Sequence, residues 1–269
     1  MMNYVESYEA ATGKAAPAEA DKLAPLFQAI ATGQLLPPRG QQAVDAGLTA
    51  HSLNDPRENR PVYQYYQWIL KNCLVDQPPR EIGAQLIGMA FTSANIFKTD
   101  LPQPLTLNPW QVPAMLDYPT KTQQAILIEN NGVFIWLHYR HPDWPLINQA
   151  GNDFNDKYLL LLQQLVRRGL RLAYLGDLDS EGIRIIDRLY QAVPELVLAD
   201  LLAIQTPQNV ANWLVRFGKQ SSKRTKRLAV QTPVLQTELE SIITFKKFVE
   251  QEQLIAVYEQ LIPRWLDNN

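Results

Sequence analysis

Three acidic residues at alternate positions follow an apolar run near the middle of this 269-residue chain. The run covers residues 172–176, and the acids are Asp177, Asp179 and Glu181. Carboxylates this close repel one another at neutral pH unless a cation or shared protons offset their charge. Hard divalent ions such as Mg²⁺ take oxygen ligands of this kind. The spacing therefore predicts a metal site and, with it, chemistry on phosphate.

A fourth acid, Glu129, ends another short apolar run, residues 125–128, and Asn-Asn-Gly follows it. Both runs are typical of buried parallel strands, and ligands of such sheets bind at the carboxyl ends of the strands. Asp177 and Asp179 point the same way if the chain there is extended, and Glu181 opens the next helix. We therefore expect Glu129, Asp177 and Asp179 to meet at one edge of a sheet, with Glu181 as a helper.

Two other interpretations of the acids remain open from the residues alone. Asp and Ser commonly cap helices, and the helix expected from residue 181 needs a cap. Asp-x-Asp also begins the haloacid-dehalogenase phosphatases, in which the first Asp is the nucleophile. Glu181 occupies the fifth position, where those enzymes usually carry Thr or Val. We expect Gly182 to let the backbone approach a phosphate, because a helix start also attracts anions.

The elements around the acids alternate between strand and helix. Strands are expected at residues 125–129, 145–148, 171–176 and 198–204, and helices at 133–139, 158–168, 181–192 and 209–217. From 238 to 266 the spacing is helical throughout, with a stop at Pro263. This alternation is typical of an α/β fold with a parallel sheet flanked by helices.

The chain before residue 119 has a different character. Helices are expected within residues 23–50, broken by Pro37 and Pro38, and at 61–70 and 80–90. Prolines punctuate residues 101–118, where only 104–107 looks like a strand. We therefore expect a mostly helical amino-terminal region, residues 1–118, and an α/β domain with a helical tail, residues 119–269.

Composition sets the broad class. Apolar residues make up 46% of the chain, so a folded core is expected. The net charge is only −2, which by itself indicates no polyanionic partner such as DNA. Cys73 is the only cysteine, and residues 1–14 lack the pattern of a signal peptide. We expect a cytoplasmic protein without a membrane span.

One local stretch could contact nucleic acid. Five cations lie within nine residues, at Lys219, Lys223, Arg224, Lys226 and Arg227. Cations interleaved with small polar residues suit phosphate contacts, although a solvated loop would have the same composition.

The two acidic segments, residues 126–130 and 176–182, resemble the Toprim domain, which is marked by a glutamate after its first strand and D-x-D after its third. Within that superfamily the chain is most similar to the JetD-like nucleases of Wadjet plasmid-defence systems and, more distantly, to topoisomerase VI A subunits. A weaker likeness extends to Glu250 and Glu252, in a Glu-Gln-Glu sequence.

The resemblance implies Mg²⁺ or Mn²⁺ held by Asp177 and Asp179, with Glu129 as a further ligand or as acid and base. It also implies that Glu250 and Glu252 lie beside the ligands, whereas Glu181 is expected as a further ligand from its place next to the Asp pair. The expected activity is a DNA endonuclease that nicks or cleaves plasmids, with a condensin-like SMC-type ATPase as partner. A winged helix within residues 1–118 and a homodimer are further expectations.

Two alternatives to hydrolysis stay open. Topoisomerase VI relatives attack DNA with a tyrosine, and Tyr65 or Tyr66 could serve, although the spacing after Arg60 differs from theirs and an aromatic stripe usually packs in a core. The chain could also be a non-catalytic DNA-binding or assembly subunit of a larger machine.

Overall fold

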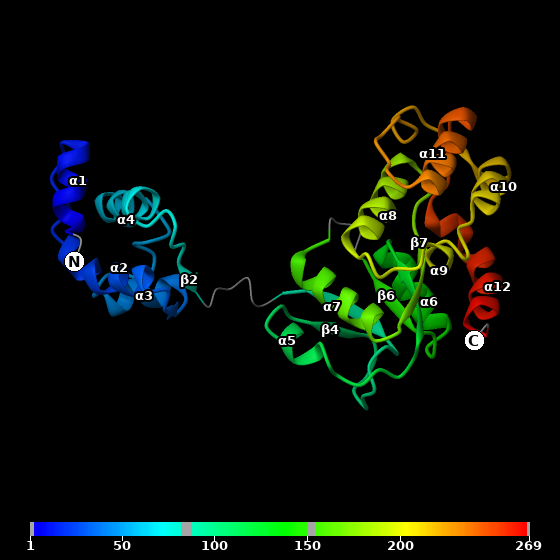
Figure 1. Ribbon diagram of the computed structural model, residues 1–269, viewed down its shortest axis with the longest axis horizontal. Coiled ribbons are helices and arrows are strands. Elements are labelled where there is room, and N and C mark those ends of the chain that lie inside the picture. The colour runs from blue at the N-terminus through cyan, green and yellow to red at the C-terminus, as the bar shows by residue number, and fades with distance from the viewer. Residues whose placement is uncertain (1–2, 82–87, 150–153, 268–269) are drawn as a thin grey trace. The chain divides into compact units, whose positions relative to one another are not determined.

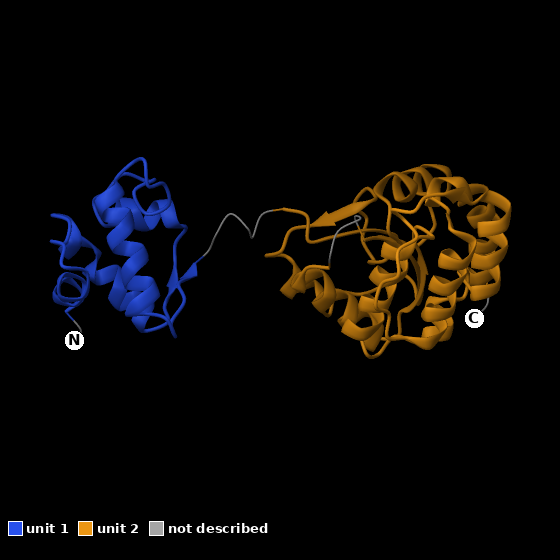
Figure 2. Cartoon of the chain, turned by 90° about the horizontal axis from the view of Figure 1, so that it is seen from above, with its two compact units in different colours: residues 1–86 blue, residues 87–269 orange. Residues whose placement is uncertain are grey.

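The computed structural model describes residues 3–81, 88–149 and 154–267. The chain divides into two compact units, residues 1–86 and 87–269, coloured separately in Figure 2. Each unit has its own apolar core. All the acids of interest belong to the second unit.

The first unit is mostly helical, as the sequence predicted. Its elements are α1 (Tyr4–Thr12), the 3-10 helix η1 (Ala20–Leu23), α2 (Ala24–Ala31), β1 (Leu35–Leu36), α3 (Arg39–Asp45), α4 (Arg60–Asn72) and β2 (Arg80–Glu81). Aromatic rings of α1, α2 and α4 pack together in its core. The helix expected over residues 80–90 is not seen in its first two residues, which form β2 in parallel with β1. Residues 82–87 of that prediction lie outside the described residues.

A five-stranded sheet, ordered β4-β3-β6-β5-β7, forms the centre of the second unit (Figure 1). The strands are β3 (Phe91–Ala94), β4 (Leu105–Leu107), β5 (Gln124–Ile128), β6 (Leu146–Asn148) and β7 (Arg171–Leu175). β5 pairs in parallel with β6 and β7, whereas β3 is antiparallel to β4 and β6. All five β5 residues are buried, as continuous apolar strands of parallel sheets require. The α/β class is confirmed.

Helices connect and cover the strands of this sheet. They are α5 (Val112–Met115), α6 (Asn131–Arg140), α7 (Asp156–Arg167), α8 (Ser180–Ala192), α9 (Leu198–Leu201), α10 (Pro207–Phe217), α11 (Pro233–Phe245), the 3-10 helix η3 (Gln251–Leu254) and α12 (Ile255–Leu266). Helix α6 connects β5 to β6, and α7 connects β6 to β7, which lies on the other side of β5. Because such crossovers are right-handed, α6 and α7 lie on opposite faces.

The boundary between the units lies earlier than the predicted residue 118. β3 pairs with both β4 and β6, so residues 88–118 contribute to the sheet of the second unit. The short strand expected at residues 104–107 is present as β4. The prolines that suggested a boundary occupy the loops around β4 and the start of α5.

Two further predicted elements, both in the second unit, differ from the structure. The expected strand at residues 198–204 is instead the short helix α9, which packs against the edge strand β7. The expected continuous helix over residues 238–266 is interrupted at Lys246, which adopts a left-handed conformation with φ 53°. A strand, β9 (Lys247–Phe248), and η3 follow before α12 begins, and Pro263 lies inside α12. Pairing of this segment with distant parts of the chain overrides its helical spacing.

The described helices are all too short or too polar to cross a membrane.

Candidate active site

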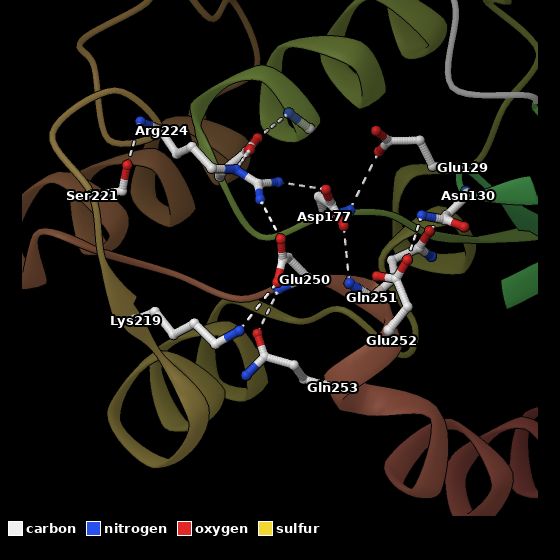
Figure 3. Close-up of polar contacts among 12 residues, drawn as sticks. Glu129, Asn130, Asp177, Lys219, Ser221, Arg224, Glu250, Gln251, Glu252 and Gln253 are labelled. Atoms are coloured by element: carbon white, nitrogen blue, oxygen red, sulfur yellow. Dashed lines mark hydrogen bonds and ion pairs between the residues drawn. The ribbon is translucent and has the colours of Figure 1, made fainter. Parts of the chain in front are cut away.

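Glu129 and Asp177 meet at the carboxyl ends of two adjacent parallel strands. Ile128 of β5 is opposite Leu175 of β7, and the Glu129 amide continues the ladder by donating to the Leu175 carbonyl at 3.0 Å. The Asp177 amide donates to Oε2 of Glu129 at 3.3 Å, which Figure 3 shows as a dashed line. The predicted convergence of the two strand ends is confirmed.

Asp179 caps α8 and belongs to the same acidic group. Its Oδ1 accepts a hydrogen bond from the Gly182 amide at 2.8 Å, so the helix-cap interpretation is correct for one oxygen. Its Oδ2 points instead to the guanidinium of Arg224, 2.6 Å away. The residue is 6% exposed. A single side chain therefore orients the helix and contributes a carboxylate to the site.

Gly182 allows α8 to begin directly against the end of β7. A Cβ atom at this position would lie 2.1 Å from the carbonyl oxygen of Asp177, which no real side chain could tolerate. The close approach that the structure gives at Gly182 is to the protein's own backbone, and the approach of a phosphate stays a prediction.

Arg224 supplies the positive charge at the centre of the acids. Its Nη2 lies 2.5 Å from Oδ2 of Asp177, its Nε 2.6 Å from Oδ2 of Asp179 and its Nη1 3.0 Å from Oε1 of Glu250. Figure 3 shows the guanidinium between Asp177 and Glu250. Its central carbon lies 4.3 Å from the centre of the Phe248 ring. One planar cation thus engages three carboxylates from two segments of the chain, residues 177–179 and residue 250.

Backbone contacts bring these distant segments to the strand end. The Ser180 amide donates to the Arg224 carbonyl at 3.0 Å. Leu178 and Val249 exchange backbone hydrogen bonds of 2.9 and 3.1 Å. Strand β8 (Lys219–Gln220) pairs with β9, just before Val249. These contacts explain why the sequence from 247 onward leaves the helical pattern at this point.

Glu250 and Glu252, singled out only by resemblance, both contact residues of the strand ends or of the basic loop. Glu250 pairs with Arg224 and, at 3.3 Å, with Lys219. Oε1 of Glu252 accepts a hydrogen bond of 2.8 Å from the side chain of Asn130. The long helix expected for both glutamates is not formed. Glu250 precedes the short 3-10 helix η3, and Glu252 lies within it.

Gln251, between the two glutamates, is a contact that sequence reasoning missed. Its amide donates to Oδ1 of Asp177 at 2.9 Å, and its side-chain oxygen accepts from the Asn130 amide at 2.8 Å. The residue is fully buried, and these two hydrogen bonds tie the two strand ends together. An uncharged side chain 74 positions from Asp177 gives no sequence signal for this role.

Glu181 is not brought into the group. Its side chain is 60% exposed and pairs with Arg184, one turn along α8. The helix orientation that directs Asp179 inward turns Glu181 to solvent. Its expected part as a helper to the metal therefore has no support in the arrangement of the side chains.

The five cations of the basic stretch have different surroundings. Lys219 and Arg224 pair with acids of the site, and Arg227 pairs with Glu240 at 2.8 Å. Within the described part of the chain, no ion pair involves Lys223 or Lys226. These two lysines are the members of the stretch best placed to contact an external phosphate.

Burial raises the pKa of two of the acids. The pKa of Glu129 rises from 4.5 to about 7, chiefly because the carboxyl is desolvated. Asp177 and Asp179 add repulsion, whereas the Tyr174 hydroxyl, which donates to Oε2 at 2.8 Å, acts in the opposite direction. The pKa of Asp177 is also raised by burial, opposed by the Gln251 amide and by Arg224. Glu129 can therefore gain or lose a proton near neutral pH.

The donors suit a hard divalent ion in type and charge. Carboxylate oxygens of Asp177 and Asp179 converge on one positive group, so the protein has a cation position here, and Arg224 is the cation that fills it. Among the described residues, no three acids, histidines or cysteines are spaced to hold a metal ion in this arrangement. A metal would need the guanidinium to leave and Glu129 to complete the ligands.

Tyr65 and Tyr66 lie in the core of the first unit. They are 1% and 0% exposed, and burial raises the pKa of each to about 12. The centres of their rings lie 5.8 and 6.1 Å from the centre of the Phe27 ring. This matches the packing interpretation of the aromatic stripe and gives neither hydroxyl the access or the acidity of a nucleophile.

A comparison with protein families matches residues 105–261, from β4 to α12, to the family described as "Protein of unknown function C-terminus (DUF2399)". The chain belongs to this family. The DUF2399 region covers more than half of the chain and contains every acid of the site together with Arg224. No curated protein matches the chain.

Proposed function

We propose that this protein is a Mg²⁺- or Mn²⁺-dependent endonuclease that nicks or cleaves DNA. The observation that supports this most is the hydrogen-bonded meeting of Glu129 with Asp177 at adjacent strand ends, with Asp179 two residues further on. Carboxylates gathered at the carboxyl edge of a parallel sheet are a common arrangement for metal-assisted chemistry on phosphate.

Each acid has a part that follows from its surroundings. Asp177 and Asp179 would hold the ion, because their Oδ2 atoms already face one cation. When bound, a divalent ion polarises the phosphate and stabilises the departing oxygen. Glu129, with a pKa near 7, would take a proton from the attacking water or return one to the leaving group. Lys223 and Lys226 would contact the DNA backbone.

The choice of DNA and the finer assignment rest on the resemblance. The glutamate after β5 and the Asp-x-Asp after β7 resemble the marks of a Toprim domain, and the likeness to JetD-like nucleases suggests defence against plasmids. An SMC-type ATPase as partner, a homodimer and a winged helix within the first unit are parts of the same proposal.

A second candidate is a non-catalytic DNA-binding or assembly subunit. It is favoured by one observation, that Arg224 already neutralises the acids by pairing with Asp177, Asp179 and Glu250. If this network were permanent, the acids would serve only to hold the loop around residue 224 to α8.

The experiment that separates the two candidates uses the purified chain and supercoiled plasmid with Mn²⁺, with Mg²⁺ or with EDTA. The nuclease proposal expects nicked or linear plasmid with either ion and none with EDTA, and loss of the product in Asp177→Asn. Asp200→Asn is the matched control, because Asp200 pairs with Arg171 at the other end of β7. Cleavage that is equal in Asp177→Asn and the unaltered protein would contradict the proposal.

A further inference from the structure

Arg224 lies where a divalent ion would have to bind. Two of its nitrogens contact the Oδ2 atoms of Asp177 and Asp179, the oxygens that the proposed function assigns to the metal. A divalent ion bound to these oxygens would place two further positive charges beside the guanidinium, and both cations would draw on the same carboxylate charge. The two therefore compete for this position.

The backbone and the side chain of Arg224 are held by different partners. The backbone carbonyl is held by the Ser180 amide at the start of α8, and the Arg224 amide lies 3.4 Å from the Ser221 hydroxyl. The guanidinium is held by carboxylates and by the Phe248 ring, and the side chain is 28% exposed. A rotation about the side-chain bonds would free the acids while the loop keeps its place.

The charges at the site favour replacement of the guanidinium by another cation over its simple departure. Asp177, Asp179 and Glu250 face Arg224 and Lys219, so removal of the guanidinium leaves three carboxylates against one ammonium. Like charges at these distances repel strongly in a partly buried site. The arginine therefore keeps the acids together until another cation takes its place.

Resting on the proposed function, we infer that Arg224 is a positioning residue that competes with the metal. Its guanidinium holds Asp177 and Asp179 in place in the metal-free protein, and a divalent ion binds by displacing it. The apparent metal affinity is then lowered by the fraction of molecules in which Arg224 occupies the site.

The test measures Mn²⁺ binding by calorimetry, or by the spin-resonance signal of the free ion, without DNA. Three proteins are compared: the unaltered chain, Arg224→Gln and, as matched control, Arg167→Gln. Arg167 pairs with Glu195 on the surface, before β7 begins. Competition predicts that Arg224→Gln lowers the dissociation constant about tenfold, a typical size for coupling between two ligands. Arg167→Gln should stay within about twofold of the unaltered chain.

Arg224→Lys guards against misfolding of the glutamine variant. Lysine keeps the charge but cannot span the carboxylates as a planar fork, so its Mn²⁺ affinity should lie between those of the unaltered chain and Arg224→Gln. An arginine that served only as a structural tie predicts the opposite, because its loss would disorder the acids. Equal or weaker Mn²⁺ binding in both Arg224 variants would overturn the inference and leave the nuclease proposal standing. If neither the unaltered chain nor the variants bind Mn²⁺, both are overturned.

Discussion

The amide nitrogen of Asp177 lies 3.3 Å from Oε2 of Glu129, a residue 48 positions earlier in the chain. The contact follows from the register of β5 and β7, which places the residues after Ile128 and Leu175 side by side. Because Glu129 is largely desolvated there, its protonation depends on the few groups that face it. Tyr174 is one of these groups.

Tyr174→Phe should raise the pKa of Glu129 further above its ordinary range. The Tyr174 hydroxyl donates to Oε2 at 2.8 Å, and a hydrogen bond to the ionised form lowers the pKa of a carboxyl. The variant should also lose about 1 kcal/mol of unfolding free energy at a pH where Glu129 is ionised. Carbon-13 NMR titration of the Glu129 carboxyl in metal-free protein measures the first effect.

Tyr158→Phe is the matched control for this titration. Tyr158 is buried in the same core, and its hydroxyl has no hydrogen-bond partner within the described residues. Its removal should leave the titration of Glu129 unchanged. If both variants move the Glu129 titration equally, the effect comes from core packing and the assigned hydrogen bond is wrong.

Asp187→Ala should cost about 3 kcal/mol of unfolding free energy, because two backbone donors, of which the Thr232 amide is buried, lose their partner. The Asp187 carboxylate accepts from the amides of Gln231 at 2.8 Å and Thr232 at 3.0 Å, and the residue is 4% exposed. Asp187→Asn keeps one accepting oxygen and should lose less. Urea denaturation measures both. Equal stability of Asp187→Ala and the unaltered chain would show that the carboxylate does not hold this loop to α8.

Glu238 should make the protein less stable as the pH rises. It is 1% exposed on α11, and burial raises the pKa of its carboxyl from 4.5 to about 8. Between these two values the folded state binds more protons than the unfolded state, so stability falls with rising pH across about pH 4.5 to 8. A shift of this size corresponds to at most about 5 kcal/mol. Glu238→Gln should remove this dependence and be the more stable protein at pH 8.

Glu240→Gln supplies the comparison for Glu238. Glu240 lies two residues further along α11, has an exposed side chain and pairs with Arg227, so its loss should change stability by less than about 1 kcal/mol. Thermal melts at pH 5, 6.5 and 8 measure both variants. A Glu238→Gln protein with the same pH dependence as the unaltered chain would contradict the assignment.

The sequence predicted the second unit well where local pattern decides structure. Apolar runs marked β5 and β7, and the parallel pairing expected of such runs predicts that Glu129 and Asp177 lie together at one sheet edge, as they do. The alternation of strands and helices gave the fold class for the same reason. The run around Leu198 was misinterpreted because a short apolar segment can be a buried strand or a helix, and only its packing on β7 decides.

The central cation could not be assigned in this way. Arg224 was expected to contact DNA with its neighbours, whereas the structure directs it inward to Asp177 and Asp179. That direction depends on contacts between distant segments, such as the bridge between Leu178 and Val249, which no local pattern records. Gln251 was missed for the same reason.

We propose that Glu129 and Asp179, which follow two adjacent strands, act as one site on DNA. The most direct test is the plasmid-nicking rate with saturating Mn²⁺ for Glu129→Gln, Asp179→Asn and the double variant. Groups that act as a unit are strongly non-additive, so each single change should lower the rate at least about a hundredfold and the double change little further. Nicking at the unaltered rate in either single variant, or losses that multiply in the double variant, would contradict the claim.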